Sequence, residues 1–348
     1  MQEMKDNNKK RKLLIVLCCV LAFVLVALMV FFIWWKAFFG QIQRIDGPEA
    51  TLSSSEEADI LNQGETVGSD FTGPSYNSSD ATVPTDPVDA LPFDENLLHI
   101  LLVGQDRRPG QGRQRSDAMI LCTLNRKDNT LTFTSFLRDV WINIPNRYPE
   151  RLNVPYAIGG FELLNDTLEH NFGVRADFNA EVDFSGFEKI IDVIGGVDIQ
   201  LTDAEARYLN RTRKWSLIQG INHMTGEQAL AYSQIRVLDS DFGRTNRQRN
   251  VLYALVEKTR NLNVKQLYAL ADSIMPLLKT DMTDADIANL ILTAVKILPK
   301  LTIKDQSFPV SGAYQFASID GKSVIYLNDK NLQKNLDVLK ETILTSGK

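Results

Sequence analysis

The hydrophobic and polar positions divide the chain into three parts of different character. Residues 13–35 are 23 consecutive residues without a charge, long enough to span a bilayer. Residues 46–92 are polar and acidic, and no Lys or Arg lies between Arg44 and Arg107. From about residue 95 onward, apolar residues recur at the spacings of strands and helices. The pattern therefore predicts a membrane segment, a disordered linker and one folded domain.

The residues around the long apolar run predict its orientation. Lys and Arg are concentrated at positions 5–12, and the positive-inside rule places this short tail in the cytoplasm. The alternative, a cleaved signal peptide, fits less well, because the run is longer than a usual signal and ends in Trp34-Trp35-Lys36 without small residues. We therefore expect a cytoplasmic tail (1–12), a transmembrane helix (13–35), an acidic linker rich in Ser, Thr and Pro (36–94) and an extracytoplasmic domain (95–348), so that the protein is a single-pass protein of the cell membrane.

Within the folded part, three early apolar runs are typical of buried strands. They are 97–105, 118–126 and 130–138, and the turn-forming residues 127–129 predict a hairpin between the last two. Helical spacing follows in 156–172, 184–195, 226–236, 244–262, 264–278, 284–298 and 329–344, with Thr283 as a helix N-cap and late strands in 301–310 and 322–327. This succession predicts an α/β fold with three layers, α/β/α, around a central mixed sheet.

The composition limits which ligands and cross-links are expected. The 348 residues carry a net charge of −5, so anion binding requires a local cluster of basic residues. Cys18 and Cys19 lie in the apolar run and Cys122 is alone, which leaves no disulfide framework. The three histidines are not at metal-ligand spacing, which argues against a zinc site.

Charged residues are concentrated where predicted strands end. The first strand leads into a Gly-rich loop with Asp106, Arg107, Arg108, Arg113, Arg115 and Asp117, and the hairpin ends in Arg138-Asp139. Ligands of open α/β sheets bind beyond the carboxyl ends of strands. Two aspartates suit Mg²⁺, and the arginine fork matches phosphate.

A second cluster is the segment 234–250, "QIRVLDSDFGRTNRQRN". We expect a helix to begin near Thr245, which puts Arg244 and Gln248 on one face and within reach of one phosphate group. The alternative is that these arginines and aspartates form ordinary surface ion pairs. Arg247 and Arg249 have no assigned role and are expected to be solvated.

Seven motifs in order resemble the LytR–CpsA–Psr family and cover most of 99–257. They read "ILLVGQDRR", "RSDAMIL", "TSFLRDVWINIP", "RLNVPYAIGG", "IIDVIGGVDI", "MTGEQALAYSQIR" and "DFGRTNRQR". The resemblance implies an enzyme that transfers a glycopolymer, such as teichoic acid or capsule, in the Gram-positive cell wall. The polymer moves from a polyprenyl-pyrophosphate carrier to peptidoglycan, through a phosphodiester to the 6-hydroxyl of N-acetylmuramic acid.

The resemblance also implies roles for individual residues. Asp106 and Asp117 match the positions that bind Mg²⁺, with Mn²⁺ as an alternative. Asp241 matches the proposed base for the attacking hydroxyl, and we expect Asp139 to orient Arg138. The residues that match the pyrophosphate-binding positions are Arg108, Arg115, Arg138, Arg236, Arg244 and Gln248, and the catalytic set is Asp241, Arg138, Asp139, Arg236 and Arg244. The helices after Tyr156 and Phe184 either line a slot for the lipid tail or are ordinary core.

Two positions depart from the family pattern. Leu137 stands where proline usually precedes the arginine, and Gln234 stands where many members have a second arginine. Arg107 is a candidate to supply the missing charge.

A pyrophosphatase acting on the same lipid-linked glycan and a non-catalytic envelope-binding or regulatory protein both stay open. Nucleic-acid binding is disfavoured, because the basic clusters follow the predicted anchor and face the outside.

Overall fold

The computed structural model describes residues 40, 43–45, 52, 54–62, 66, 71–79, 81, 83–84, 86–107 and 111–344. The chain divides into two compact units, Met1–Ile42 and Gln43–Lys348, and every described helix and strand belongs to the second. The predicted tail and membrane segment, 1–12 and 13–35, lie outside the described residues. None of the helices in the described ranges combines the length and apolar character needed to cross a membrane.

A seven-stranded mixed sheet forms the centre of the second unit. Its order is β1 (Gln43–Arg44), β11 (Lys279–Thr280), β8 (Phe178–Asp183), β3 (Leu97–Gln105), β4 (Ser116–Asn125), β5 (Thr130–Phe136) and β12 (Thr302–Phe308). The three early apolar runs are β3, β4 and β5, and β4 and β5 form the predicted antiparallel hairpin. Parallel pairing of β3 with β8 and of β5 with β12 makes the sheet mixed, as predicted.

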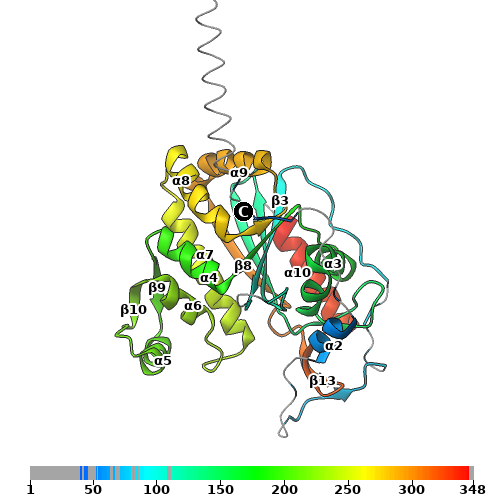
Figure 1. Ribbon diagram of the computed structural model, residues 1–348. Helices are drawn as coiled ribbons and strands as arrows, with labels where there is room; N and C mark the ends of the chain where they lie inside the picture. The colour runs from blue at the N-terminus through cyan, green and yellow to red at the C-terminus, as the bar shows by residue number, and fades with distance from the viewer. Residues whose placement is uncertain are drawn as a thin grey trace, which may run out of the picture. The chain divides into compact units, whose positions relative to one another are not determined.

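Alternate residues of β4 face two different helical layers. Met119 and Leu121 pack in one core cluster with residues of α3 (Val154–Phe172) and α10 (Asp329–Leu344). Ile120 and Cys122 pack in another with residues of α7 (Asp241–Thr259). Helices therefore cover both faces of the sheet, with α3 and α10 on one side and α7 on the other (Figure 1), which confirms the three-layer prediction.

A further cluster packs beside α7. It joins α4 (Phe184–Val193), the hairpin of β9 (Val197–Leu201) and β10 (Gly220–Met224), α5 (Asp203–Arg213) and α6 (Gly226–Ser233). Capping boxes fix the starts of α5, at Thr202 and Glu205, and of α6, at Thr225 and Gln228. Most apolar residues of α3 and Ile191 of α4 are buried in these clusters, whereas Phe184 at the start of α4 is half-buried.

Two of the helix boundaries that differ from the prediction lie in or next to the segment 234–250. Helix α6 ends at Ser233, so Arg236 lies in a loop. Helix α7 begins at Asp241, four residues before the expected Thr245, because the carbonyl of Ser240 already accepts bonds from the amides of Gly243 and Arg244. An acidic residue in the first turn, such as Asp241, also favours a helix start.

The C-terminal third adds α8 (Val264–Ile274), α9 (Asp284–Ile297) and two short 3-10 helices, Met275–Leu277 and Leu298–Lys300. Thr283 is the N-cap of α9, as predicted, and forms a capping box with Asp286. The late strands 301–310 and 322–327 correspond to β12 and β14 (Lys322–Tyr326). Strand β13 (Gln315–Ile319), which pairs with β14, was not predicted.

Part of the predicted linker is folded. Helix α2 (Ser54–Asn62) contacts α3, and its Ile60 is buried in the main core cluster. Strand β2 (Ser75–Tyr76) pairs with β13, and the amide of Leu91 donates to the carbonyl of Gly173. The expectation of a disordered linker therefore fails for these described segments, because a few apolar side chains and strand pairing bind them to the domain.

Leu137, which stands where the family usually has proline, contributes to the packing and hydrogen bonding of the domain. Its side chain is fully buried, and its amide donates to the carbonyl of Phe308 at 2.8 Å. Leu137→Pro is expected to lower the free energy of unfolding by about 2–4 kcal/mol, because it removes this donor and leaves a cavity. Chemical denaturation of both proteins measures the difference, and unchanged stability would contradict the role of this hydrogen bond.

Candidate functional site

The predicted site residues lie at one edge of the central sheet. In the observed register, Gln105 at the end of β3 faces Ser116 at the start of β4, and Phe136 at the end of β5 faces Met119. Because β4 is antiparallel to both neighbours, its first residues share an edge with the last residues of β3 and β5. This edge carries Asp106, Asp117, Arg138 and Asp139.

A pocket of about 220 Å³ lies at this edge. Its lining combines the strand ends with the loop after α6 and the first turns of α7: Gly104, Asp106, Asp117, Ala118, Phe184, Ser233, Gln234, Arg236, Arg244 and Gln248. Arg244 and Gln248 share one face of α7, as their spacing predicted. Five predicted site residues far apart in the sequence thus meet in one pocket: Asp106, Asp117, Arg236, Arg244 and Gln248.

Asp117 connects two of the predicted arginines. It accepts a hydrogen bond of 2.9 Å from Arg138 Nη1 and lies 3.4 Å from Arg236 Nη2. Asp139 Oδ2 is 3.4 Å from Arg138 Nε, an ion-pair distance. Asp117 thus links Arg236, which lines the pocket, to Arg138 beside it.

Arg244 is the most informative residue of the pocket. Its side chain is only 2% exposed, and its Nη2 donates to Asp241 Oδ2 at 2.7 Å. Nε and Nη1 are buried and have no partner among the described residues, and neither does Gln248 Oε1. Burial lowers the pKa of Arg244 to about 10, with Asp241 opposing the shift, so the side chain keeps its charge at neutral pH. A buried cation with unused donors is costly, and an anion bound in the pocket would satisfy it.

Arg115 is close to the charges of Arg138 and Asp139. It does not line the 220 Å³ pocket, and its Nη2 donates to the carbonyl oxygen of Ile60 in α2. Burial, together with the nearby Arg151, lowers its pKa to about 10, while Glu150 and Asp139 oppose the shift. Arg108 lies outside the described residues.

A family model described as the LytR_cpsA_psr family matches residues 69–341 of the chain. The chain belongs to this family. The polyisoprenyl-teichoic acid–peptidoglycan teichoic acid transferase TagT of Bacillus subtilis is 30% identical over 232 residues, which cover 64% of this chain and 72% of that protein.

Two further comparisons agree. TagU of Bacillus cereus, which carries the same transferase name, is 35% identical over 190 residues, or 53% of this chain, and the match spans 60% of that protein's length. A solved structure of TagT bound to LIIa-WTA has a TM-score of 0.60 at 26% identity and covers 74% of this chain and 96% of that chain.

Gln234 stands where many members of the LytR–CpsA–Psr family have a second arginine. Arg107 does not replace this missing positive charge. Gln234 lines the pocket, whereas Arg107 Nη2 lies 3.2 Å from Glu181 and 3.6 Å from Asp183. Arg107 lines a different cavity with these two carboxylates. The proposed compensation is therefore wrong, because buried and half-buried acidic residues of β8 already pair with Arg107.

Two carboxylates that line the 220 Å³ pocket suit a divalent cation. Asp106 and Asp117 both line it, and Mg²⁺ often uses one or two carboxylates together with water and substrate phosphates. Across the described ranges, no group of three or more His, Cys, Asp or Glu side chains is arranged to hold a metal ion. The donor set therefore fits Mg²⁺ bound together with a phosphate ligand better than an all-protein metal site.

Arg247 and Arg249 are not solvated, contrary to the sequence expectation. Each is 5% exposed, and Arg247 lies 2.7 Å from Glu205 and 2.6 Å from Asp239. Arg249 lies 2.7 Å from Asp305. Glu205 and Asp305 are 42 and 56 residues away in the sequence, so no local pattern could reveal these pairs.

Sequence reasoning also gave no role to Arg151. It is 2% exposed, and its Nη1 lies 3.9 Å from Asp139, the residue expected to orient Arg138. Its Nε lies 3.4 Å from Glu150. The available signal was an arginine at the start of the otherwise apolar motif "RLNVPYAIGG".

Proposed function

We propose that this protein is a phosphotransferase that moves a glycopolymer from a polyprenyl-pyrophosphate carrier to peptidoglycan. The product is a phosphodiester to the 6-hydroxyl of N-acetylmuramic acid. The observation that carries the proposal is Arg244, which lines the pocket with Arg236 and two aspartates and whose buried Nε and Nη1 have no partner among the described residues. The transferase names of TagT and TagU and the solved complex of TagT with LIIa-WTA support this choice of substrate class.

The pocket residues suit in-line displacement at phosphorus. The acceptor oxygen forms a bond to the phosphorus that carries the polymer, and the bond from that phosphorus to the bridging oxygen breaks. The lipid leaves as its monophosphate, and the hydroxyl proton moves to Asp241. Arg236 and Arg244 stabilise the charge on the phosphate oxygens, while Asp139 and Asp117 position Arg138.

In this proposal Asp106 and Asp117 hold Mg²⁺, with Mn²⁺ as an alternative. When bound, the ion supplies positive charge to the phosphate oxygens. Asp117 also receives Arg138 and Arg236, so its carboxylate orders the arginines in addition to binding the ion.

Loss of one metal ligand should weaken the response to the ion. Asp106→Asn is expected to raise the Mg²⁺ concentration for half-maximal transfer at least about tenfold, because even supporting residues around a metal change its affinity by this much. Electron paramagnetic resonance of Mn²⁺ measures affinity without turnover. Asp272→Asn, an exposed aspartate on α8, is the control. An unchanged Mn²⁺ affinity in Asp106→Asn would show that Asp106 is not a ligand of the metal ion.

The main rival is a pyrophosphatase that acts on the same donor, with water in place of the sugar hydroxyl. Purified donor with a label in the polymer separates the two reactions. If the protein is a transferase, the label is expected in the insoluble peptidoglycan. Muramidase should then release the label as a muropeptide adduct. Label found only as free phosphorylated glycan, with peptidoglycan present, would support the pyrophosphatase and contradict the proposal.

The membrane arrangement belongs to the same proposal. Residues 13–35 would anchor the protein in the cell membrane as a single-pass helix, with 1–12 in the cytoplasm and the catalytic domain outside. A phosphatase reporter that is active only outside the cytoplasm, fused after Lys348, is expected to be active. If instead only a reporter that requires the cytoplasm were active when fused after Lys348, the proposed topology would be wrong.

A further inference from the structure

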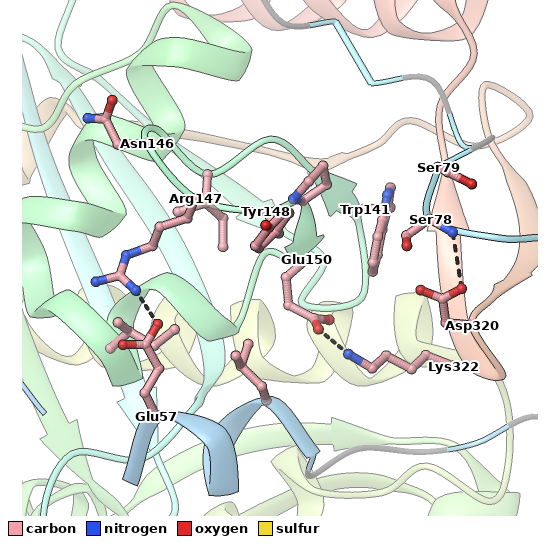
Figure 2. A pocket seen from close by; sticks show the side chains of 14 residues that line it. Glu57, Ser78, Ser79, Trp141, Asn146, Arg147, Tyr148, Glu150, Asp320 and Lys322 are labelled. Atoms are coloured by element: carbon pink, nitrogen blue, oxygen red, sulfur yellow. Dashed lines mark hydrogen bonds and ion pairs between the residues drawn. The ribbon is translucent and has the colours of Figure 1, made fainter. Parts of the chain in front are cut away.

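A second cavity of about 650 Å³ lies beside the small hairpin of β6 (Trp141–Ile142) and β7 (Glu150–Arg151). Five separate segments line it (Figure 2): α2, residues 78–79, residues 141–150, α3 through Ile158, and the turn between β13 and β14. None of its lining residues belongs to the 220 Å³ pocket. Its volume lies in the range of about 300–1,000 Å³ that is usual for ligand sites.

Two aromatic residues give this cavity both an apolar surface and a hydrogen-bond donor. Tyr148 is 91% exposed, so its ring face is available to a ligand. Trp141 is only 4% exposed, and its buried Nε1 has no partner within the described part of the chain. The faces of aromatic rings carry partial negative charge and attract C–H groups, while a buried indole N–H usually finds an acceptor. A sugar ring offers both C–H faces and hydroxyl oxygens.

The charges of the cavity distinguish it from the arginine pocket. Three carboxylates, Glu57, Glu150 and Asp320, accompany two cations, Arg147 and Lys322. Glu57 pairs with Arg147, Glu150 pairs with Lys322, and Asp320 accepts a bond of 3.0 Å from the amide of Ser78 (Figure 2). Internal pairing leaves no excess of positive charge for a polyanion, so the lining favours an uncharged polar ligand.

Ion pairs connect this cavity with the proposed transfer site. Asp117, which lines the 220 Å³ pocket, binds Arg138, and Arg138 Nε lies 3.4 Å from Asp139. Asp139 lies 3.9 Å from Arg151, and Arg151 lies 3.4 Å from Glu150, which pairs with Lys322 in the cavity. Two lining residues of the cavity, Glu150 and Lys322, therefore belong to the same network of ion pairs as Arg138.

We propose that this cavity is a carbohydrate subsite that binds an uncharged segment of a glycan strand. Tyr148 packs against a sugar face, and Trp141 Nε1 donates to a ring or hydroxyl oxygen. The identification of this strand as the acceptor rests on the proposed function. Binding itself does not require transfer.

The test uses the β-1,4-linked N-acetylglucosamine tetramer as probe, titrated calorimetrically into the full chain in detergent. Saturable binding is expected. Tyr148→Ala is expected to raise the Kd by about tenfold, through loss of the aromatic contact. Trp141→Phe keeps the buried ring but loses the donor, and is expected to raise the Kd by about fivefold. Phe93→Ala is the matched control, because Phe93 is 93% exposed and lies outside the cavity lining.

Other results would overturn the assignment. The subsite is wrong if the wild type shows no saturable binding, or if both Tyr148→Ala and Trp141→Phe bind as tightly as wild type. It is also wrong if a glycerol-phosphate oligomer displaces the tetramer, since the cavity would then accept a polyanion. Arg244→Ala should bind the tetramer normally. If that variant also retained full transfer, the proposed function would fail while the carbohydrate subsite stood.

Discussion

Replacing Arg244 by alanine is expected to lower kcat/KM for transfer by about 10²- to 10³-fold, the usual effect of removing one donor from developing charge in a transition state. The variant loses a buried guanidinium with two donors that have no protein partner in the described ranges. Arg244→Lys is expected to recover only part of the rate, because lysine is a point charge without the planar fork. The measurement is a kinetic assay with purified lipid-linked donor and peptidoglycan.

Stability must be followed in the same variants. Asp241, the partner of Arg244, is 18% exposed and so keeps contact with water, and Nε and Nη1 of Arg244 have no partner in the described ranges, so Arg244→Ala should remain folded. Circular dichroism and chemical denaturation provide this control. A folded Arg244→Ala protein with full turnover would reject the catalytic interpretation and favour a non-catalytic envelope-binding or regulatory protein.

Arg247→Ala, only three residues away, is expected to have the opposite effect. Its guanidinium binds Glu205 and Asp239, and Glu205 is 7% exposed at the start of α5. Removal of one partner from a buried ion pair leaves the other charge uncompensated, which costs about 3–5 kcal/mol. We therefore expect a large loss in the free energy of unfolding, measured by chemical denaturation, with little change in turnover per folded molecule.

The matched control is an arginine in an exposed pair. Arg207 pairs with Asp203 on α5, and their side chains are 74% and 51% exposed. Arg207→Ala is expected to change stability by less than about 1 kcal/mol. Similar losses in Arg207→Ala and Arg247→Ala would contradict the importance of burial at Arg247.

The strands and layers were predictable because the signals are local. The long apolar runs of β3, β4 and β5 can be buried on both faces only between two helical layers. The turn at Lys127-Asp128-Asn129 fixes the hairpin, and Asn129 takes the left-handed conformation with φ of 57°. The shared face of Arg244 and Gln248 follows from helix geometry alone.

The errors concern contacts between residues far apart in the sequence. Arg249 with Asp305, Arg107 with Glu181 and Arg115 with Ile60 all depend on how elements pack, which charge patterns do not encode. The folded α2 was missed because its nine residues have little apolar content, and Ile60 alone is deeply buried. The same patterns could not separate Arg247, a buried arginine paired with Glu205 and Asp239, from Arg244, the buried arginine that we propose binds phosphate.

The most direct measurement is a crystal structure with polyprenyl pyrophosphate and Mg²⁺ bound. We predict phosphate oxygens within hydrogen-bond distance of Arg244 Nε and Nη1 and of Arg236, with the ion between Asp106, Asp117 and the phosphates. A pyrophosphate bound away from the pocket lined by these residues, with the Arg244 donors still unpaired, would contradict the proposed function.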